Sequence, residues 1–213
     1  TFIDTVEYFV ARPVIQIQSA SVQALYLNCG NEITVNVPAL GSEYNPSFSA
    51  TGGDVIRGSK PGEVTVIPKS KKVDLNVSNA GNYIGSQSFG VRQIPAPEIK
   101  ATVRGKEIDA KSGIPVSTPS FSLDAIADAS FAEFLPKDAR FQVREAEINL
   151  VRAGRGVSRQ RVNSKDVNLN SLAGKRKGDN IVIEIKRVAR ANFRGDVEDF
   201  KNFAPRFITI PLN

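Results

Sequence analysis

The stretch "ALYLNCGNEITVNVP", residues 24–38, alternates apolar and polar side chains on both sides of a short turn that contains glycine. Its second half places Ile33, Val35 and Val37 on one face and polar residues on the other, which is typical of a half-buried antiparallel strand. Because a Gly-Asn pair favours a tight turn, we predict a β-hairpin with the only cysteine, Cys29, at its bend.

The same alternation recurs at short spacing through the first part of the chain. Clusters such as Gly52-Gly53 and "NAGN" at 79–82 separate the segments, and no helical period lies between them. Several short strands with such turns predict a β-sandwich of the immunoglobulin type. The predicted strands are residues 5–10, 14–18, 24–28, 33–37, 63–67, 73–77 and 83–91.

Two proline-bearing stretches predict domain boundaries. In "RQIPAPEIKA", residues 92–101, two prolines separated by one residue stop strand pairing. The stretch "YFVARPVIQI", residues 8–17, has a similar pattern, with a strand, an arginine, a proline and a new strand. We therefore predict three parts: residues 1–11 as the closing strand of a preceding domain absent from this chain, 12–95 as an immunoglobulin-like sandwich, and 96–213 as a basic β-rich C-terminal domain.

The second module is also predicted to be rich in strands. Its apolar runs predict strands at residues 99–103, 139–151, 181–188 and 206–211. The face of the second run changes partway, which indicates a bulge near Glu145. The stretch "DASFAEFLP", residues 128–136, predicts one helical turn. The fold class is therefore mainly β, with an immunoglobulin-like sandwich followed by a β-rich domain with one or two short helices.

Composition argues against most catalytic templates. The chain has no histidine, methionine or tryptophan, and one cysteine. Without histidine there is no Ser-His or Cys-His pair and no imidazole ligand for a metal. Cys29 has no basic neighbour to lower its pKa, so we interpret it as an inert, partly packed thiol. We expect no enzyme activity, cofactor, metal or small-molecule substrate. No apolar run reaches the roughly 18 residues that span a bilayer. Since the chain begins at Thr1, we expect it to be a piece of a longer protein.

Charge is distributed unevenly between the two modules. Residues 1–96 carry 7 Lys/Arg and 7 Asp/Glu, whereas residues 97–213 carry 21 and 15, so the net charge of +6 lies in the second module. A basic surface attracts phosphate, anionic lipid or an acidic protein face. Nucleic acid is disfavoured because Phe193 is the only aromatic residue within 152–194. We predict a partner-binding surface formed by Arg152, Arg155, Arg159, Arg161, Lys175, Arg176 and Lys177.

Other local patterns have structural interpretations. "AGRGVS" and "AGKRKG" satisfy neither phosphate-loop motif. We instead predict a helical turn capped by Asn170 or Ser171, with basic residues near its C-terminal end and Gly178 as its stop. Asp124 and Asp128 are spaced like a carboxylate pair, but their small neighbours offer no sugar platform, so turn or surface roles are favoured.

Four stretches resemble the GldM/PorM family of the type IX secretion and gliding motility machinery, and the PorM branch is the closer one. "YFVARPVIQIQSASVQALYLNCGNEITVNVPAL" resembles the family's third domain, and "FGVRQIPAPEIKA" resembles its exit strand and linker. "ARFQVREAEINLVRAGRG" followed by "AGKRKGDNIVIEIKRVAR" is similar to its fourth, C-terminal domain. The resemblance covers essentially the whole chain.

This resemblance implies a non-catalytic periplasmic rod. The rod would be a homodimer, anchored in the inner membrane beside a PorL/GldL-type protein through a segment absent from this chain. Its C-terminal end would reach a PorK/PorN-type lipoprotein ring and transmit energy for secretion. The alternatives are a cell-surface adhesin or carbohydrate-binding module, which the scarcity of aromatic residues disfavours, and a hydrolase, which the lack of histidine disfavours.

Overall fold

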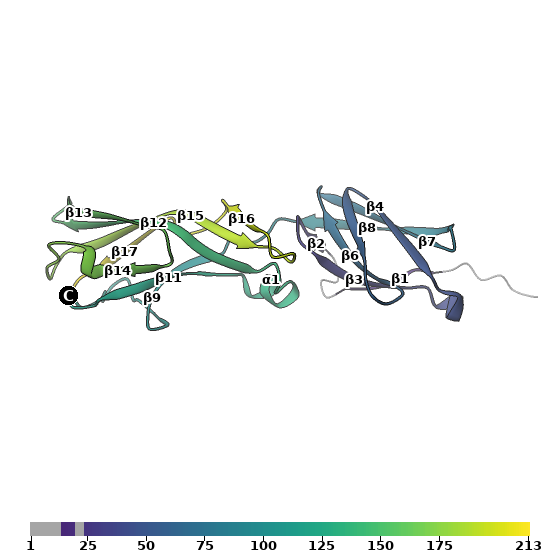
Figure 1. Cartoon of the computed structure of the whole chain (residues 1–213), viewed down its shortest axis with the longest axis horizontal. Helices are drawn as coiled ribbons and strands as arrows, with labels where there is room; N and C mark the ends of the chain where they lie inside the picture. Colours follow the sequence, from purple (N-terminus) through teal and green to yellow (C-terminus); the bar gives the residue numbers. More distant parts are fainter. Residues whose placement is uncertain (1–13, 20–23) are drawn as a thin grey trace, which may run out of the picture. The chain divides into compact units, whose positions relative to one another are not determined.

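The computed structural model describes residues 14–19 and 24–213. The strand predicted at 5–10 and the closing strand predicted at 1–11 lie outside these residues. The chain divides into two compact units, Thr1–Gln93 and Ile94–Asn213, which we call unit 1 and unit 2. Each unit has its own hydrophobic core. The chain is mainly β, as predicted (Figure 1).

Unit 1 is an immunoglobulin-like sandwich of two four-stranded sheets. One sheet has the order β1-β3-β6-β5 and the other β2-β8-β7-β4. Alternating apolar residues from both sheets meet between them and form the core, which includes Leu25, Val35, Val66 and Leu75. The elements are β1 (Gln16–Ser19), β2 (Ala24–Tyr26), β3 (Asn31–Asn36), the 3₁₀ segment η1 (Pro38–Glu43), β4 (Pro46–Thr51), β5 (Gly53–Arg57), β6 (Glu63–Pro68), β7 (Lys72–Asn79) and β8 (Asn82–Arg92).

The hairpin predicted at residues 24–38 is wrong. β2 pairs in parallel with β8, whereas β3 pairs antiparallel with β1 and β6 in the other sheet. The turn between β2 and β3 therefore carries the chain from one sheet to the other, with Asn28 in the left-handed region at φ 53°. Alternation of apolar residues is the same in a hairpin and in such a crossing, so the pattern could not distinguish them.

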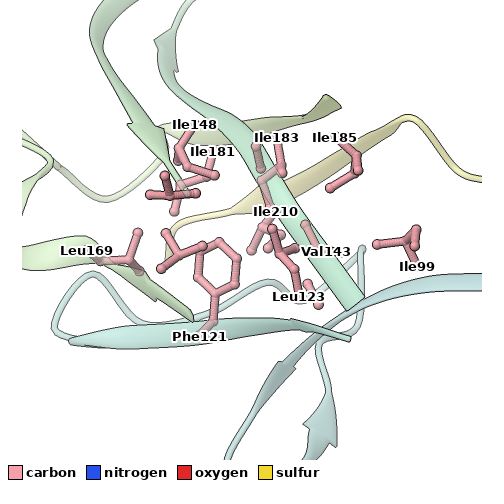
Figure 2. Close-up of a cluster of buried hydrophobic side chains, with 14 of the residues drawn as sticks. Ile99, Phe121, Leu123, Val143, Ile148, Leu169, Ile181, Ile183, Ile185 and Ile210 are labelled. Atoms are coloured by element: carbon pink, nitrogen blue, oxygen red, sulfur yellow. The ribbon is translucent and has the colours of Figure 1, made fainter. Parts of the chain in front are cut away.

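Unit 2 packs two sheets around a larger core. One sheet has the order β13-β12-β15-β16, with β17 also paired to β15, and the other has the order β10-β9-β11-β14. Figure 2 shows Phe121 and Leu123 reaching from the second sheet toward Ile183 and Ile210 of the first. The elements are β9 (Glu98–Val103), β10 (Lys106–Glu107), β11 (Ser120–Ile126), α1 (Ala129–Phe134), β12 (Arg140–Arg152), β13 (Arg155–Val162), β14 (Asp166–Asn168), η2 (Leu169–Ser171), β15 (Asn180–Ala191), β16 (Val197–Phe200) and β17 (Phe207–Pro211).

Two local predictions in unit 2 are confirmed and one is wrong. The register between β12 and β15 shifts on both sides of Glu145, which confirms the bulge. The helical turn is α1, and Asp128 caps it by accepting a hydrogen bond from Phe131 N. The other turn, η2, is a 3₁₀ segment capped by Asn168 rather than by Asn170 or Ser171. It ends at Ser171, and the next residue, Leu172, has an extended backbone.

Candidate functional site

Arg152, the first residue of the predicted basic surface, forms an ion pair within unit 2. It lies at the end of β12, and its Nε and Nη2 donate to the two carboxylate oxygens of Asp179 at 2.7 and 2.8 Å. Nη2 also donates to Gly174 O, and the side chain of Asp179 is 2% exposed. The hydrogen bond from Arg152 lowers the pKa of Asp179, to which the Arg176 backbone N–H adds, and the same pair raises the pKa of Arg152. Arg152 thus anchors the loop of residues 172–179.

Arg159 and Arg161 lie on the outer face of the sheet and pair with acids of the neighbouring strand. Arg159 contacts Glu147 at 2.9 Å, and Arg161 contacts Glu145 at 2.6 Å. The pKa of Glu147 is lowered, first by the hydrogen bond from Asn149 and then by Arg159. These two arginines are well exposed, but their charges are largely offset by adjacent carboxylates.

The other four predicted residues, Arg155, Lys175, Arg176 and Lys177, make no ion pair with any described residue. Arg155 follows the two-residue turn between β12 and β13, and the three others lie in the 172–179 loop. Arg152 holds this loop beside that turn, and Gly178 N donates to Leu212 O near the C-terminus. The β12–β13 turn and the 172–179 loop therefore lie at one end of unit 2 (Figure 1), and we call the four cations that they carry the basic end.

The structure also places charged residues that the sequence reasoning missed. Arg190 of β15 is fully buried, and it contacts Asp138 Oδ1 at 3.1 Å and Glu198 Oε1 through Nε at 3.0 Å. Asp138, 1% exposed, also accepts from Phe193 N at 3.1 Å. The sequence carries a signal for this, because Arg190 follows Val188 on the core-facing side of β15. Arg190 therefore joins the segment after α1 to β15 and β16, and it has no access to a ligand.

Cys29 is completely buried in unit 1, so the prediction of a partly packed thiol was wrong. It lies at the crossing between the sheets, where Asn31 makes the principal polar contacts. Asn31 Oδ1 accepts from Tyr26 N at 2.8 Å, and Nδ2 contacts the carbonyl oxygens of Tyr26, Cys29 and Val66 at 2.9 to 3.2 Å. The crossing is thus a hydrogen-bonded corner of the scaffold.

Among the residues that the structure describes, no three His, Cys, Asp or Glu side chains gather where they could hold a metal ion. Asp124, weighed as half of a carboxylate pair, accepts from Thr102 Oγ1 at 2.7 Å and lies 3.4 Å from Lys165 Nζ. Asp128 caps α1. No helix in the described residues is long and apolar enough to cross a membrane.

Two β units that follow one another in the chain define a modular, mainly β class of protein. Residues 14–92 match the GldM third domain, and residues 95–213 match the GldM C-terminal domain. The chain belongs to the GldM family and is a component of the gliding motility and type IX secretion machinery. The family is a structural component of that machinery, and its domains are the periplasmic parts.

The solved structures to which the chain is similar include an adhesin and a set of fibronectin(III)-like modules. The adhesin InvE of Yersinia pseudotuberculosis is 16% identical over 93% of this chain and 58% of its own, with a TM-score of 0.27. The fibronectin(III)-like modules of Clostridium thermocellum CbhA are 11% identical over 92% of this chain and 94% of theirs, also with a TM-score of 0.27. TM-scores this low carry no argument about function. No curated protein matches the chain.

Proposed function

We propose that this chain is the outer part of a non-catalytic periplasmic link in the type IX secretion system. In this proposal it forms a homodimeric rod, anchored in the inner membrane beside a PorL/GldL-type protein through a segment outside this chain. The rod transmits energy for secretion to a PorK/PorN-type lipoprotein ring. The observation that carries the proposal is the match to two consecutive family domains in their family order, residues 14–92 and 95–213.

The basic end of unit 2 is the proposed contact with an acidic face of the ring proteins. Arg155, Lys175, Arg176 and Lys177 form no ion pair among the described residues, although the charge of Arg176 helps to lower the pKa of Asp179. In contrast, Arg159 and Arg161 pair with Glu147 and Glu145. Complementary charge chiefly accelerates encounter and selects partners. We therefore assign the docking role to the basic end, and Arg152 supports it by holding the 172–179 loop.

The contact can be tested by reversing the three loop charges with Lys175→Glu, Arg176→Glu and Lys177→Glu. Association with purified PorK/PorN-type proteins is measured at low and high ionic strength. At low salt we expect the rate constant to fall by at least about tenfold, since screening is weak there, and the difference should shrink as salt is added. Folding should persist because Arg176 and Lys177 are exposed and Lys175 is half-buried, and charges outside the core contribute little to stability.

A matched control reverses three positive charges outside the basic end. Lys71, Arg92 and Lys106 are exposed and make no ion pair with any described residue, so their triple reversal to glutamate changes net charge equally. This control should retain most of the association rate. A loop variant that associates as fast as the parent at low salt would contradict the docking proposal.

An apolar contact through the C-terminal strand is the competing explanation. In that strand Ile210 and Leu212 are buried in the core, whereas Phe207 is 61% exposed. The variant Phe207→Ser separates the two explanations, since it removes the apolar side chain and leaves the basic end intact. If Phe207→Ser abolishes binding while the loop variant binds normally, the docking site is the strand.

Dimer formation is tested separately by sedimentation of the full chain at high protein concentration. We expect self-association through unit 1, because among the described strands β4 and β5 are end strands of its two sheets, and an end strand can pair with another chain. A monomer at all concentrations would contradict the dimeric part of the proposal and leave its docking part standing.

A further inference from the structure

On one side of unit 2, the outer strands of the two sheets, β13 and β14, pair with only part of their neighbours β12 and β11. β13 pairs with β12 from Ala146 to Arg152, whereas β15 pairs with the other side of β12 from Arg140 onward. In the opposite sheet, β14 pairs with β11 only from Ser120 to Ser122. In Figure 1, β13 and β14 stay at one end of unit 2, while β12 and β11 continue toward α1. Within the described residues, no strand covers this side of residues 140–145.

A cavity lies between the two sheets where the side is open. It has a volume of about 230 Å³ and is lined by Leu123, Asp124, Ala125, Phe141, Gln142 and Lys165. Leu123 belongs to the core, and Ala125 and Phe141 pack against it. Asp124 is already engaged by Thr102 and Lys165. The lining is therefore mixed, and an apolar side chain would be favourable against its apolar part, which consists of Leu123, Ala125 and Phe141.

The outer face of the same edge has a second, basic depression. Its volume is about 120 Å³, and besides two arginines it is lined by Phe141, Gln142, Ala189, Ala191 and Val197. The long side chains of Arg140 and Arg144 rise beside these residues. Arg140 is fixed because it donates to the backbone oxygens of Lys137 and Asn192 at 3.0 and 2.6 Å. Arg144 is exposed and makes no ion pair with a described residue. This rim is suited to a carboxylate.

We propose that residues 140–145 of β12 accept an extended segment of a partner protein as an added strand. Alternate side chains of a strand point to opposite faces. One set would enter the opening and contact Leu123, Ala125 and Phe141, and the other would lie beside Arg140, Gln142 and Arg144. The segment that fits therefore alternates small apolar residues with aspartate or glutamate. Six residues of β12 span about 20 Å, and the regular part of this edge, residues 140–143, ends at the bulge near Glu145, so the site suits one short strand.

Charge favours such a segment over a second copy of this chain. If two copies paired antiparallel through this edge, Arg140 of one would lie near Arg144 of the other, and like charges directly opposite destabilise a pair. The nearby acids cannot offset this, since Glu145 pairs with Arg161 and Asp124 lies close to Lys165. The site is also distinct from the basic end, whose charges lie at the β12–β13 turn and beyond it in the chain.

The probe is a labelled, acetylated hexapeptide in which valine alternates with glutamate. Its binding to the full chain is measured by fluorescence anisotropy, and amide hydrogen exchange locates the contact. We expect saturable binding that weakens with salt, and new protection at alternate amides of residues 140–145. A peptide with lysine in place of glutamate should bind much more weakly.

Arg144→Glu is the decisive variant because Arg144 makes no ion pair with a described residue that its loss would break. It should weaken binding of the glutamate peptide by about tenfold and improve binding of the lysine peptide. Lys106→Glu, the same charge change on the edge strand β10 of the other sheet, should alter either affinity by less than about twofold. Unchanged core exchange in both variants shows that they fold.

Three results would overturn the proposal: no saturable binding up to about 1 mM peptide, equal binding of the two peptides, or protection located outside residues 140–145. Self-association of the chain that protects these residues would also overturn it, because the occupant would then be a second copy. Charge reversal at Lys175, Arg176 and Lys177 should leave peptide binding unchanged, so this test and that of the basic end can fail independently.

Discussion

Unit 1 and unit 2 are both two-sheet β units, but their buried polar contacts are of different kinds. In unit 1 the crossing between sheets is fixed by a neutral amide, Asn31, which is 2% exposed. In unit 2 the corresponding buried polar contacts are ion pairs, Arg190 with Asp138 and Arg152 with Asp179. Hydrogen bonds between neutral groups respond little to pH or salt, whereas charged groups respond to both. The two units should therefore lose stability under different conditions.

The largest effect is expected from breaking the buried ion pair of unit 2. Arg190→Met keeps much of the side-chain volume but leaves the carboxylate of Asp138, 1% exposed, without its guanidinium. Removing one partner of a buried pair typically costs about 3–5 kcal/mol. We expect unit 2 to lose about that much stability in a denaturant titration followed by amide exchange, while unit 1 is unchanged.

Arg187→Met is the matched control for this variant. Arg187 lies on the same strand and pairs with Asp199, but both side chains are more than half exposed. An exposed pair contributes roughly 0–1 kcal/mol, so the control should be nearly neutral. Equal losses in the two variants would show that burial is not what makes the Arg190 pair important.

The second largest effect is expected from the amide of unit 1. Asn31→Ala removes the acceptor of Tyr26 N and a donor to Val66 O inside the sandwich. Leaving buried backbone groups without these bonds should cost unit 1 about 2–4 kcal/mol, measured in the same titration. Asn36→Ala, at the exposed end of the same strand, should change stability by less than about 0.5 kcal/mol. Similar losses at both positions would refute the special role of Asn31.

How far the fold could be predicted depends on how apolar each strand is. β3 and β7 alternate valine, isoleucine or leucine with polar residues, and the sequence located both. β4, "PSFSAT", and β13, "RGVSRQRV", were missed because small or charged residues mask their alternation. β13 is an edge strand, where charge is tolerated because one side faces solvent. The sheet to which a strand belongs depends on long-range pairing, which is why the crossing after β2 was taken for a hairpin.

The candidate site shows the same limit: composition predicted where the charge lies, but not which residues pair with one another. Counting charges placed the basic surface in the second module, but it could not show which cations are already paired. Arg152 and Asp179 are 27 residues apart and meet only because β12 and the 172–179 loop end side by side. The open edge at residues 140–145 was also invisible in the sequence, since it results from β13 and β14 being shorter than their neighbours.

Lowering the pH should also change the stabilities of the two units by different amounts, and we expect this difference to be smaller than the effects of the substitutions above. The pKa of Asp179 lies below its ordinary value of 3.8, chiefly because of Arg152, so its contribution is present above that value and is lost as pH falls through the lower folded pKa. In the described residues, Asp109 and Glu147 of unit 2 are lowered in the same direction, whereas unit 1 has only Asp74. Unit 2 should therefore lose more stability than unit 1 between pH 6 and pH 3.

Arg152→Ala tests the cause of this acid sensitivity. Without Arg152 the folded pKa of Asp179 should rise toward its ordinary value, so unit 2 should melt lower at pH 6, on the order of 5 °C, and lose less on acidification than the parent. Melting followed by amide signals of each unit gives both numbers. An unchanged pH dependence of unit 2 would show that its acid sensitivity arises elsewhere.

The smallest change in stability is expected from substitution of Cys29, whose thiol can also be used to measure how often unit 1 opens. Cys29→Ala removes one buried sulfur and should cost unit 1 about 1 kcal/mol or less. Because Cys29 is the only cysteine and is completely buried, a thiol reagent should reach it only when unit 1 opens, so its labelling rate measures that opening. Asn31→Ala should accelerate labelling strongly, whereas Arg190→Met should leave it unchanged. Faster labelling in Arg190→Met would mean that the two units unfold together, and the contrast between an amide-stabilised and an ion-stabilised unit would then describe their contacts but not their stabilities.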